Sequence, residues 1–169
     1  MTPLDTAFAM MDTNEASNTP EANGENVTTI STRFGTFEVN LDKAIEMPQG
    51  PLGFVDLQRF ALLDLPEAED SPLKLFQSLE DTSVTFIVNV VSSDTDWIAE
   101  ADLEAACQGY SIQPENAAYL IITKVQRTLD GSAQTTLNLR APIVVDIVHQ
   151  VARQAVFSGE KYSMQHVVA

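Results

Sequence analysis

The sequence has a single cysteine, Cys107, among 169 residues, so no internal disulfide can form and a reducing compartment suits the chain. No apolar run approaches the roughly 18 residues needed to cross a bilayer. The first residues lack the basic segment followed by an apolar segment that marks a secretory signal. We therefore expect a cytoplasmic protein with no membrane partner.

Basic residues are also scarce. Nine Lys and Arg stand against 24 Asp and Glu, which gives a formal net charge of −15. Nucleic-acid binding depends on Lys and Arg that neutralise phosphates, so this balance argues against a direct role on DNA or RNA. An acidic surface could attract a basic protein partner, although solubility alone also explains such a charge.

The first 26 residues differ from the rest of the chain. They contain five acidic residues, no Lys or Arg, and many Thr, Asn, Ser, Ala and Pro residues. Such a composition cannot bury enough apolar surface to offset the entropy lost on ordering. We expect residues 1–26 to form an acidic, disordered extension and residues 27–169 to form one domain. A competing interpretation makes the extension an acidic mimic that captures basic proteins.

From residue 27 the pattern indicates β-structure. Phe37, Val39 and Leu41 alternate with polar residues and so share one face of a strand. Further strands are expected at 28–34, 60–65, 73–79, 85–91, 117–127, 133–138, 143–148 and 151–157. The Asp130–Gly131 pair favours a type I′ hairpin turn between two of them.

A single helix is expected near residue 102, with Asp102 as its N-cap and Gly109 as a left-handed stop. Short strands at regular spacing with one short helix indicate an all-β sandwich or barrel.

The stretch at 47–54, MPQGPLGF, contains two prolines and two glycines. The prolines lack the N–H donors that a phosphate-binding loop would use, and no helix follows. We expect a shaped corner that places Phe54 in the core.

No catalytic, cofactor or metal site is predicted. Cys107 lies on the apolar face of the expected helix among acids, which favours packing over reactivity. His149 and His166 lie 17 residues apart without a further ligand at metal-site spacing. An acidic β-barrel enzyme of hydrolase type, using clustered carboxylates such as Glu80 and Asp81, is the alternative function. It would require two acids that converge in one pocket.

Several motifs occur in an order typical of one family. They are TRFGTFEV at 32–39, GPLGF at 50–54, LFQSLED at 75–81, TFIV at 85–88 and NLRAPIVV at 138–145. With these motifs the chain resembles FliW, the bacterial flagellar assembly factor. The resemblance spans about residues 28–167, and an ordered set of motifs is far more specific than a single one.

The resemblance implies a small FliW-like β-barrel of about eight to ten short strands with one or two short helices, and no enzymatic activity. It also implies two partners, flagellin and the CsrA-type RNA-binding regulator, which represses flagellin mRNA. The mechanism that the resemblance implies is partner switching: when flagellin is exported, the freed protein sequesters CsrA. Motif density and polarity favour one contact surface made of six residues: Gln77, Ser78, Glu80, Asp81, Asn138 and Arg140.

Overall fold

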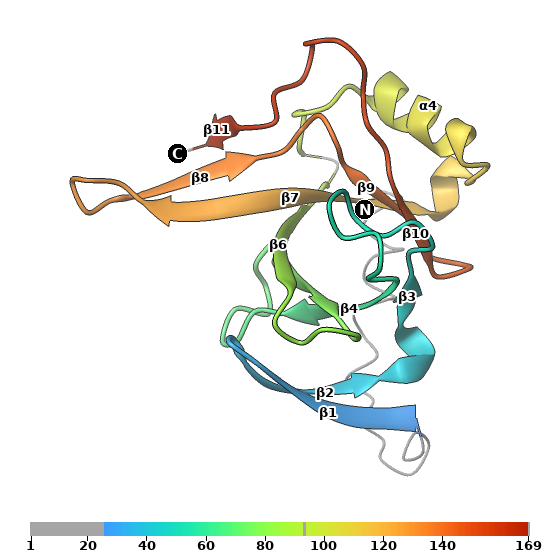
Figure 1. The fold of residues 1–169 in the computed structure, drawn as a ribbon. Helices are drawn as coiled ribbons and strands as arrows, with labels where there is room; N and C mark the ends of the chain where they lie inside the picture. Colours follow the sequence, from blue (N-terminus) through green and yellow to red (C-terminus); the bar gives the residue numbers. More distant parts are fainter. Residues whose placement is uncertain (1–25, 93, 169) are drawn as a thin grey trace.

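The computed structural model describes residues 26–92 and 94–168, and these form a mostly β-sheet structure with one α-helix (Figure 1). The strands are β1 (Val27–Thr32), β2 (Gly35–Asn40), β3 (Ile45–Glu46), β4 (Arg59–Asp64), β5 (Leu73–Ser78), β6 (Thr85–Val90), β7 (Ala117–Arg127), β8 (Ala133–Leu137), β9 (Ile143–Asp146), β10 (Val151–Gln154) and β11 (His166–Val168). The helix is α4 (Glu100–Gly109), and the 3₁₀ turns are η2 (Leu41–Lys43) and η3 (Pro114–Asn116). The predicted all-β class is confirmed, and all nine predicted strands are present. The prediction for residues 1–25 lies outside the described residues.

Seven strands form a closed ring. The order β7-β6-β5-β4-β3-β10-β9 returns to β7, because β9 pairs with the first residues of β7. All neighbours are antiparallel except β3 and β10, which pair in parallel through Glu46 and Val151. β8 and β11 extend the sheet beyond the ring, and β1 and β2 form a separate two-stranded sheet, seen below β4 in Figure 1.

Two cores lie on opposite sides of β7 and β9. Ala118 and Leu120 belong to the cluster that contains the stacked rings of Phe60 and Phe76, whereas Tyr119 and Ile121 belong to the cluster under helix α4. Successive strand residues point to opposite faces, so β7 is buried on both. This explains why residues 117–123 form an almost continuous apolar run rather than an alternating one.

Residues 138–142 form a bulge along one edge of β7. β8 pairs with residues 123–127 of β7 and β9 pairs with residues 117–120, so the chain leaves β7 and returns to it. The C-terminal segment satisfies the bulge backbone: Leu139 N donates to Ser163 O (2.9 Å), Ala155 N to Pro142 O (2.9 Å) and Phe157 N to Arg140 O (2.8 Å). The extra residues therefore serve as a junction between the ring and the C-terminal segment.

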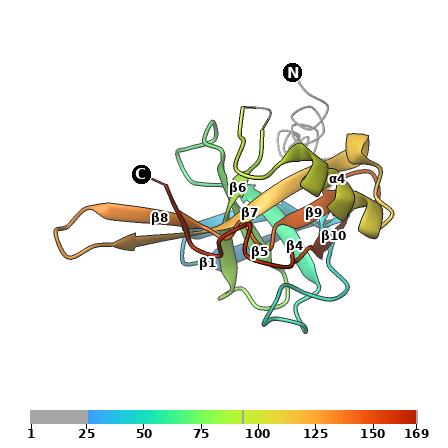
Figure 2. The same cartoon turned by 90° about the horizontal axis from the view of Figure 1, so that it is seen from above.

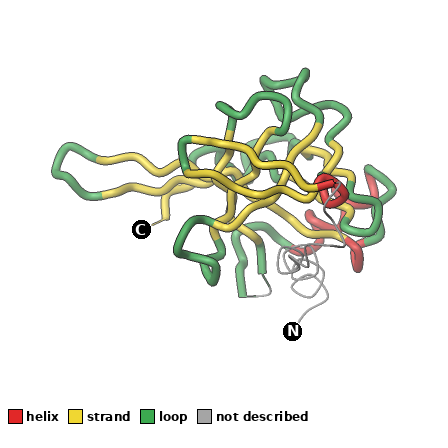
Figure 3. Tube along the Cα trace, turned by 90° about the horizontal axis from the view of Figure 1, so that it is seen from below, coloured by secondary structure: helices red, strands yellow, loops and turns green. Residues whose placement is uncertain are grey.

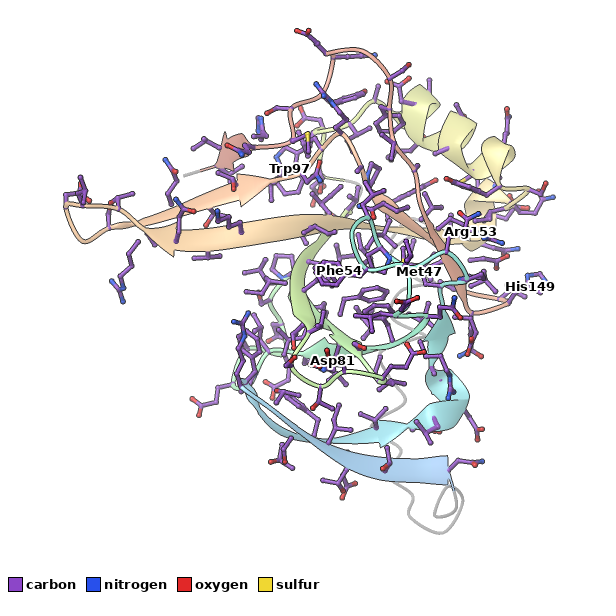
Figure 4. The ribbon with its side chains drawn as sticks, in the orientation of Figure 1. Met47, Phe54, Asp81, Trp97, His149 and Arg153 are labelled. Atoms are coloured by element: carbon purple, nitrogen blue, oxygen red, sulfur yellow. The ribbon has the colours of Figure 1, made fainter. Side chains whose placement is uncertain are left out.

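The 47–54 stretch is a tight corner, as predicted, but its aromatic residue is not in the core. Phe54 is 39% exposed and lies edge-on to Phe86, while Met47, Gly50 and Pro51 are the buried residues of the corner. Figure 4 shows both side chains beside the ring. Gly50 has a φ of +65°, and a Cβ there would lie 2.2 Å from Phe54 O. The corner folds back on Gly50, and this close approach turns Phe54 outward.

Three local predictions need correction. The N-cap of α4 is Ala99, with no side-chain cap, because the helix begins two residues before Asp102; the Asp102 carboxylate accepts hydrogen bonds from Tyr162 and Lys161. The left-handed residue after the helix is Ser111, not Gly109; Ile112 N then bonds to Cys107 O and the Ile112 side chain is buried. Between β7 and β8, only Gly131 has positive φ, whereas a type I′ turn needs two such residues.

Figure 2 and Figure 3 show α4 against one side of the ring, and the β7–β8 hairpin projecting from the other. None of the helices within 26–92 and 94–168 has the length and apolarity to cross a membrane.

The Gly50→Ala substitution tests the corner. We expect it to lower the free energy of unfolding by about 2–4 kcal/mol, because it combines positive φ with a backbone clash. Gly53→Ala is the matched control: its φ is +86° but nothing lies within 4 Å of the added Cβ, so about 1 kcal/mol is expected. Urea denaturation measures both, and equal losses would show that the clash is relieved.

Candidate partner-binding surface

Gln77 braces the turn between β5 and β6 from inside. Its side chain is fully buried, and its Nε2 donates to Ser78 O (2.9 Å) and Thr82 O (3.2 Å). Its Oε1 accepts a hydrogen bond from the Thr85 hydroxyl. A buried amide with three partners is satisfied, so Gln77 stabilises the turn and presents no surface to a partner.

Ser78 is the second internal brace. Its Oγ accepts hydrogen bonds from the backbone N–H groups of Glu80 (3.1 Å) and Asp81 (3.0 Å), and the residue has no exposed surface. Serine is suited to this position because a hydroxyl can receive turn N–H groups that no strand partner reaches. Any effect of Gln77 or Ser78 on a partner would therefore be transmitted through the turn.

Glu80 and Asp81, unlike Gln77 and Ser78, are exposed in this turn. Glu80 Oε1 accepts from Gln58 N (2.5 Å) and Arg59 N (3.1 Å), which ties the turn to the start of β4. Asp81 Oδ1 accepts from Ser83 Oγ (2.6 Å) and Ser83 N (3.0 Å), and these hydrogen bonds lower the pKa of Asp81. Each carboxylate keeps a second oxygen with no protein partner among the described residues, so both remain able to contact a partner.

Asn138 and Arg140 lie in the bulge between β8 and β9. Arg140 Nε donates to Tyr162 O (3.0 Å), and Asn138 N donates to Ile122 O (2.9 Å). Asn138 Oδ1 is buried without a hydrogen-bond partner in the described part of the chain. β5 and β8 are three strand positions apart in the sheet, about 14 Å at the usual spacing. The structure thus separates these two residues from the Gln77–Asp81 turn, and a partner role for the six stays a prediction.

An acidic region lies elsewhere and was not recognised in the sequence. Between Lys74 and Lys124 there is no Lys or Arg, and eight acidic residues occur. Four of them, Asp94, Asp96, Glu100 and Glu104, are exposed on the segment before α4 and on α4 itself. We call these four residues the acidic face. The missing signal was the absence of bases over this long segment, since each acid alone resembles an ordinary surface residue.

The backbone that carries the acidic face is held in place by buried side chains and by hydrogen bonds to the C-terminal segment. Trp97, labelled in Figure 4, packs partly buried against the core cluster, and Ile98 is buried. The Tyr162 hydroxyl donates to Asp102 and accepts from Ala99 N (3.0 Å), while Lys161 Nζ donates to Asp102 (2.9 Å). Both hydrogen bonds to the Asp102 carboxylate lower its pKa. The C-terminal segment thus anchors the start of α4 and fixes where its carboxylates lie.

The described residues offer little for catalysis. No group of three or more His, Cys, Asp or Glu in this part of the chain is placed to hold a metal ion. Cys107 is buried, its Sγ lies 3.0 Å from the Tyr119 hydroxyl, and burial raises its pKa. A thiol in that state is a poor nucleophile, which agrees with the predicted packing role.

The FliW protein family model matches residues 28–168, nearly the whole described domain. The chain belongs to the FliW family. Among curated relatives, the flagellar assembly factor FliW of Geotalea uraniireducens is 33% identical over 136 residues, which covers 80% of each chain. The same factor from Thermoanaerobacter pseudethanolicus is 28% identical over 138 residues, or 80% of this chain and 88% of the relative.

A solved structure supports the fold of this FliW-family chain. The crystal structure of the flagellar assembly factor FliW superimposes with a TM-score of 0.62 at 23% sequence identity. The match covers 82% of this chain and 95% of the solved one. The described domain therefore shares its overall fold with that structure.

Removal of the Ser78 hydroxyl tests the internal brace. Ser78→Ala leaves the N–H groups of Glu80 and Asp81 without their acceptor, and we expect the free energy of unfolding to fall by about 1–3 kcal/mol. Ser83→Ala is the matched control, because its hydroxyl donates to the exposed Asp81; a change within about 0.5 kcal/mol is expected. Equal effects in urea denaturation would contradict the assignment.

Proposed function

We propose that this FliW-family protein is a cytoplasmic, non-enzymatic flagellar assembly factor that binds flagellin and a CsrA-type regulator in turn. Flagellin retained in the cell occupies the protein, and CsrA represses flagellin mRNA. When flagellin is exported, the freed protein sequesters CsrA and translation resumes. The family match supports the assembly role, and the acidic face is the observation that supports binding to a basic regulator.

Electrostatics give the binding of CsrA a physical basis. An RNA-binding surface is basic because phosphates must be neutralised, and a carboxylate-rich surface complements it. Over residues 94–104 the chain supplies five acids and no bases, and among the described residues only Asp102 of these five has an ion-pair partner, Lys161. Carboxylates docked beside the RNA site would disfavour RNA through repulsion as well as direct contact.

The alternative, a carboxylate enzyme, receives less support. Glu80 and Asp81 accept hydrogen bonds from backbone and hydroxyl groups of their own turn, and the pKa of Asp81 is lowered. A general acid needs the opposite shift, toward the operating pH. These two residues therefore resemble fixed surface charges rather than an acid–base pair.

The deciding experiment mixes the purified chain with flagellin and CsrA from the same cell, separately and together. We expect one-to-one competition: each partner binds alone, and flagellin displaces CsrA. Binding of neither partner would reject the proposal, and a stable ternary complex would reject the switch. Deletion of residues 1–26 should leave both affinities unchanged, whereas a loss would favour the acidic-mimic interpretation.

Neutralising the acidic face tests where CsrA binds. The combined change of Asp94 and Asp96 to Asn and of Glu100 and Glu104 to Gln should weaken CsrA binding by about 10- to 100-fold at about 50 mM salt. The loss should shrink at about 300 mM, because salt screens exposed charges. The control neutralises four exposed acids elsewhere, Glu38, Asp56, Glu69 and Asp70, which changes the net charge equally. Equal losses in titration calorimetry would show that net charge, not the acidic face, is recognised.

A further inference from the structure

The β7–β8 hairpin leaves the body of the protein as a two-stranded ribbon. β6 pairs with β7 only as far as Thr123, and β11 pairs with β8 only from Thr135 to Leu137. Lys124 and Val125 therefore have only β8 as a strand neighbour, and beyond them residues 126–127 and 133–134 pair with each other alone. Figures 1, 2 and 3 all show the ribbon projecting away from the ring. At residues 126–127 and 133–134 neither outer edge of the ribbon has a further strand partner.

The tip of the ribbon is a closely hydrogen-bonded turn. Thr128 N donates to Ser132 O (2.8 Å) and Gly131 N donates to Thr128 O (3.0 Å). Asp130 Oδ1 accepts from Ser132 N (3.0 Å), from Ser132 Oγ (2.7 Å) and from the Thr128 hydroxyl. These bonds lower the pKa of Asp130 to about 2, so the carboxylate that joins the two strands stays ionised at neutral pH. A tip tied in this way holds one shape before any partner arrives.

This turn presents a leucine to water. Leu129 has a relative exposure of 109%, so folding of its own chain buries none of its apolar surface. On the ribbon below it, Val125 is 46% exposed and shares a face with Arg127 and Ala133 according to the strand register. Solvated turns are usually polar, and a large apolar side chain on a preorganised support is the usual form of an interface anchor.

The ribbon also differs from the body in charge. Lys124 and Arg127 lie on it and pair with no carboxylate in the described part of the chain, although Arg127 Nη1 donates to Gly131 O (3.2 Å). On the body, Arg59, Lys74 and Lys161 each form an ion pair, whereas Arg33, Lys43, Arg140 and Arg153 form none with the described residues. On a protein with a net charge of −15, residues 124–134 carry two cations and one carboxylate, Asp130, and their turn carries the fully exposed Leu129.

We propose that the ribbon is the flagellin-binding element, and that Leu129 enters an apolar pocket on flagellin whose rim carries carboxylates for Lys124 and Arg127. The inference rests on the proposed function, which supplies two partners. The basic regulator is repelled by the two cations and is drawn to the acidic face, so the ribbon is left for flagellin. The partners then use separate surfaces of opposite charge, and the bulk of flagellin rather than shared contact residues excludes CsrA.

Leu129→Ser gives a direct test, because a fully exposed side chain can be removed without loss of stability. We expect unchanged urea denaturation, about tenfold weaker binding of flagellin from the same cell, and unchanged binding of CsrA. Arg127→Gln should weaken flagellin binding severalfold at low salt only. The matched control is Val148→Ser, at an apolar side chain 59% exposed in the turn between β9 and β10; it should alter neither affinity.

Each other outcome overturns the inference. If the wild-type chain binds flagellin and Leu129→Ser binds it equally well, the assignment of the ribbon as the flagellin-binding element is rejected and the proposed function is unaffected. A loss of CsrA binding would assign the ribbon to the regulator instead. A solution mass above one chain that Leu129→Ser abolishes would identify a second copy of this chain as the occupant. Failure of the wild-type chain to bind flagellin would reject both the inference and the flagellin part of the proposed function.

Discussion

Four residue pairs between β7 and β9, from Ala117–Asp146 to Leu120–Ile143, close the ring, and the rest of the molecule depends on them. Because β8 pairs with the same edge of β7 further along, the chain must leave and rejoin that edge, and residues 138–142 form the resulting bulge. The C-terminal segment then binds the bulge backbone and carries Lys161 and Tyr162 to the start of α4. One long strand thus organises the two cores, the junction and the ribbon.

Most of the fold could be predicted from local patterns, because apolar alternation and turn residues report on strands wherever one face is exposed. β3 and β11 were missed since strands of two and three residues contain too few positions for a period. The position of Phe54 was wrong for a different reason. Its exposure follows from the contact between Gly50 and the backbone at Phe54, and the composition of the corner does not reveal which side chain is turned outward.

The candidate surface was harder to predict. A polar residue in a sequence can either satisfy buried backbone groups or contact a partner, and its polarity does not distinguish the two roles. Gln77 and Ser78 are polar and belong to a family motif, yet their side chains satisfy turn groups in the interior. Leu129 carries a signal that can be recognised afterwards: a leucine inside Thr-Leu-Asp-Gly-Ser has no neighbour to pack on. Whether such a residue folds inward or stays in water depends on how far the hairpin extends, and only the tertiary structure decides that.

The burial of Cys107 has a practical consequence. Its sulfur lies between α4 and β7, beside the Tyr119 hydroxyl, and no other cysteine exists in the chain. A thiol reagent reaches it only when the helix separates from the sheet, so the rate of its alkylation measures how often that local opening occurs. Two of the four residues of the acidic face, Glu100 and Glu104, lie on this same helix. The alkylation rate of Cys107 therefore reports how often α4, which carries part of the surface that we assign to the regulator, separates from the sheet.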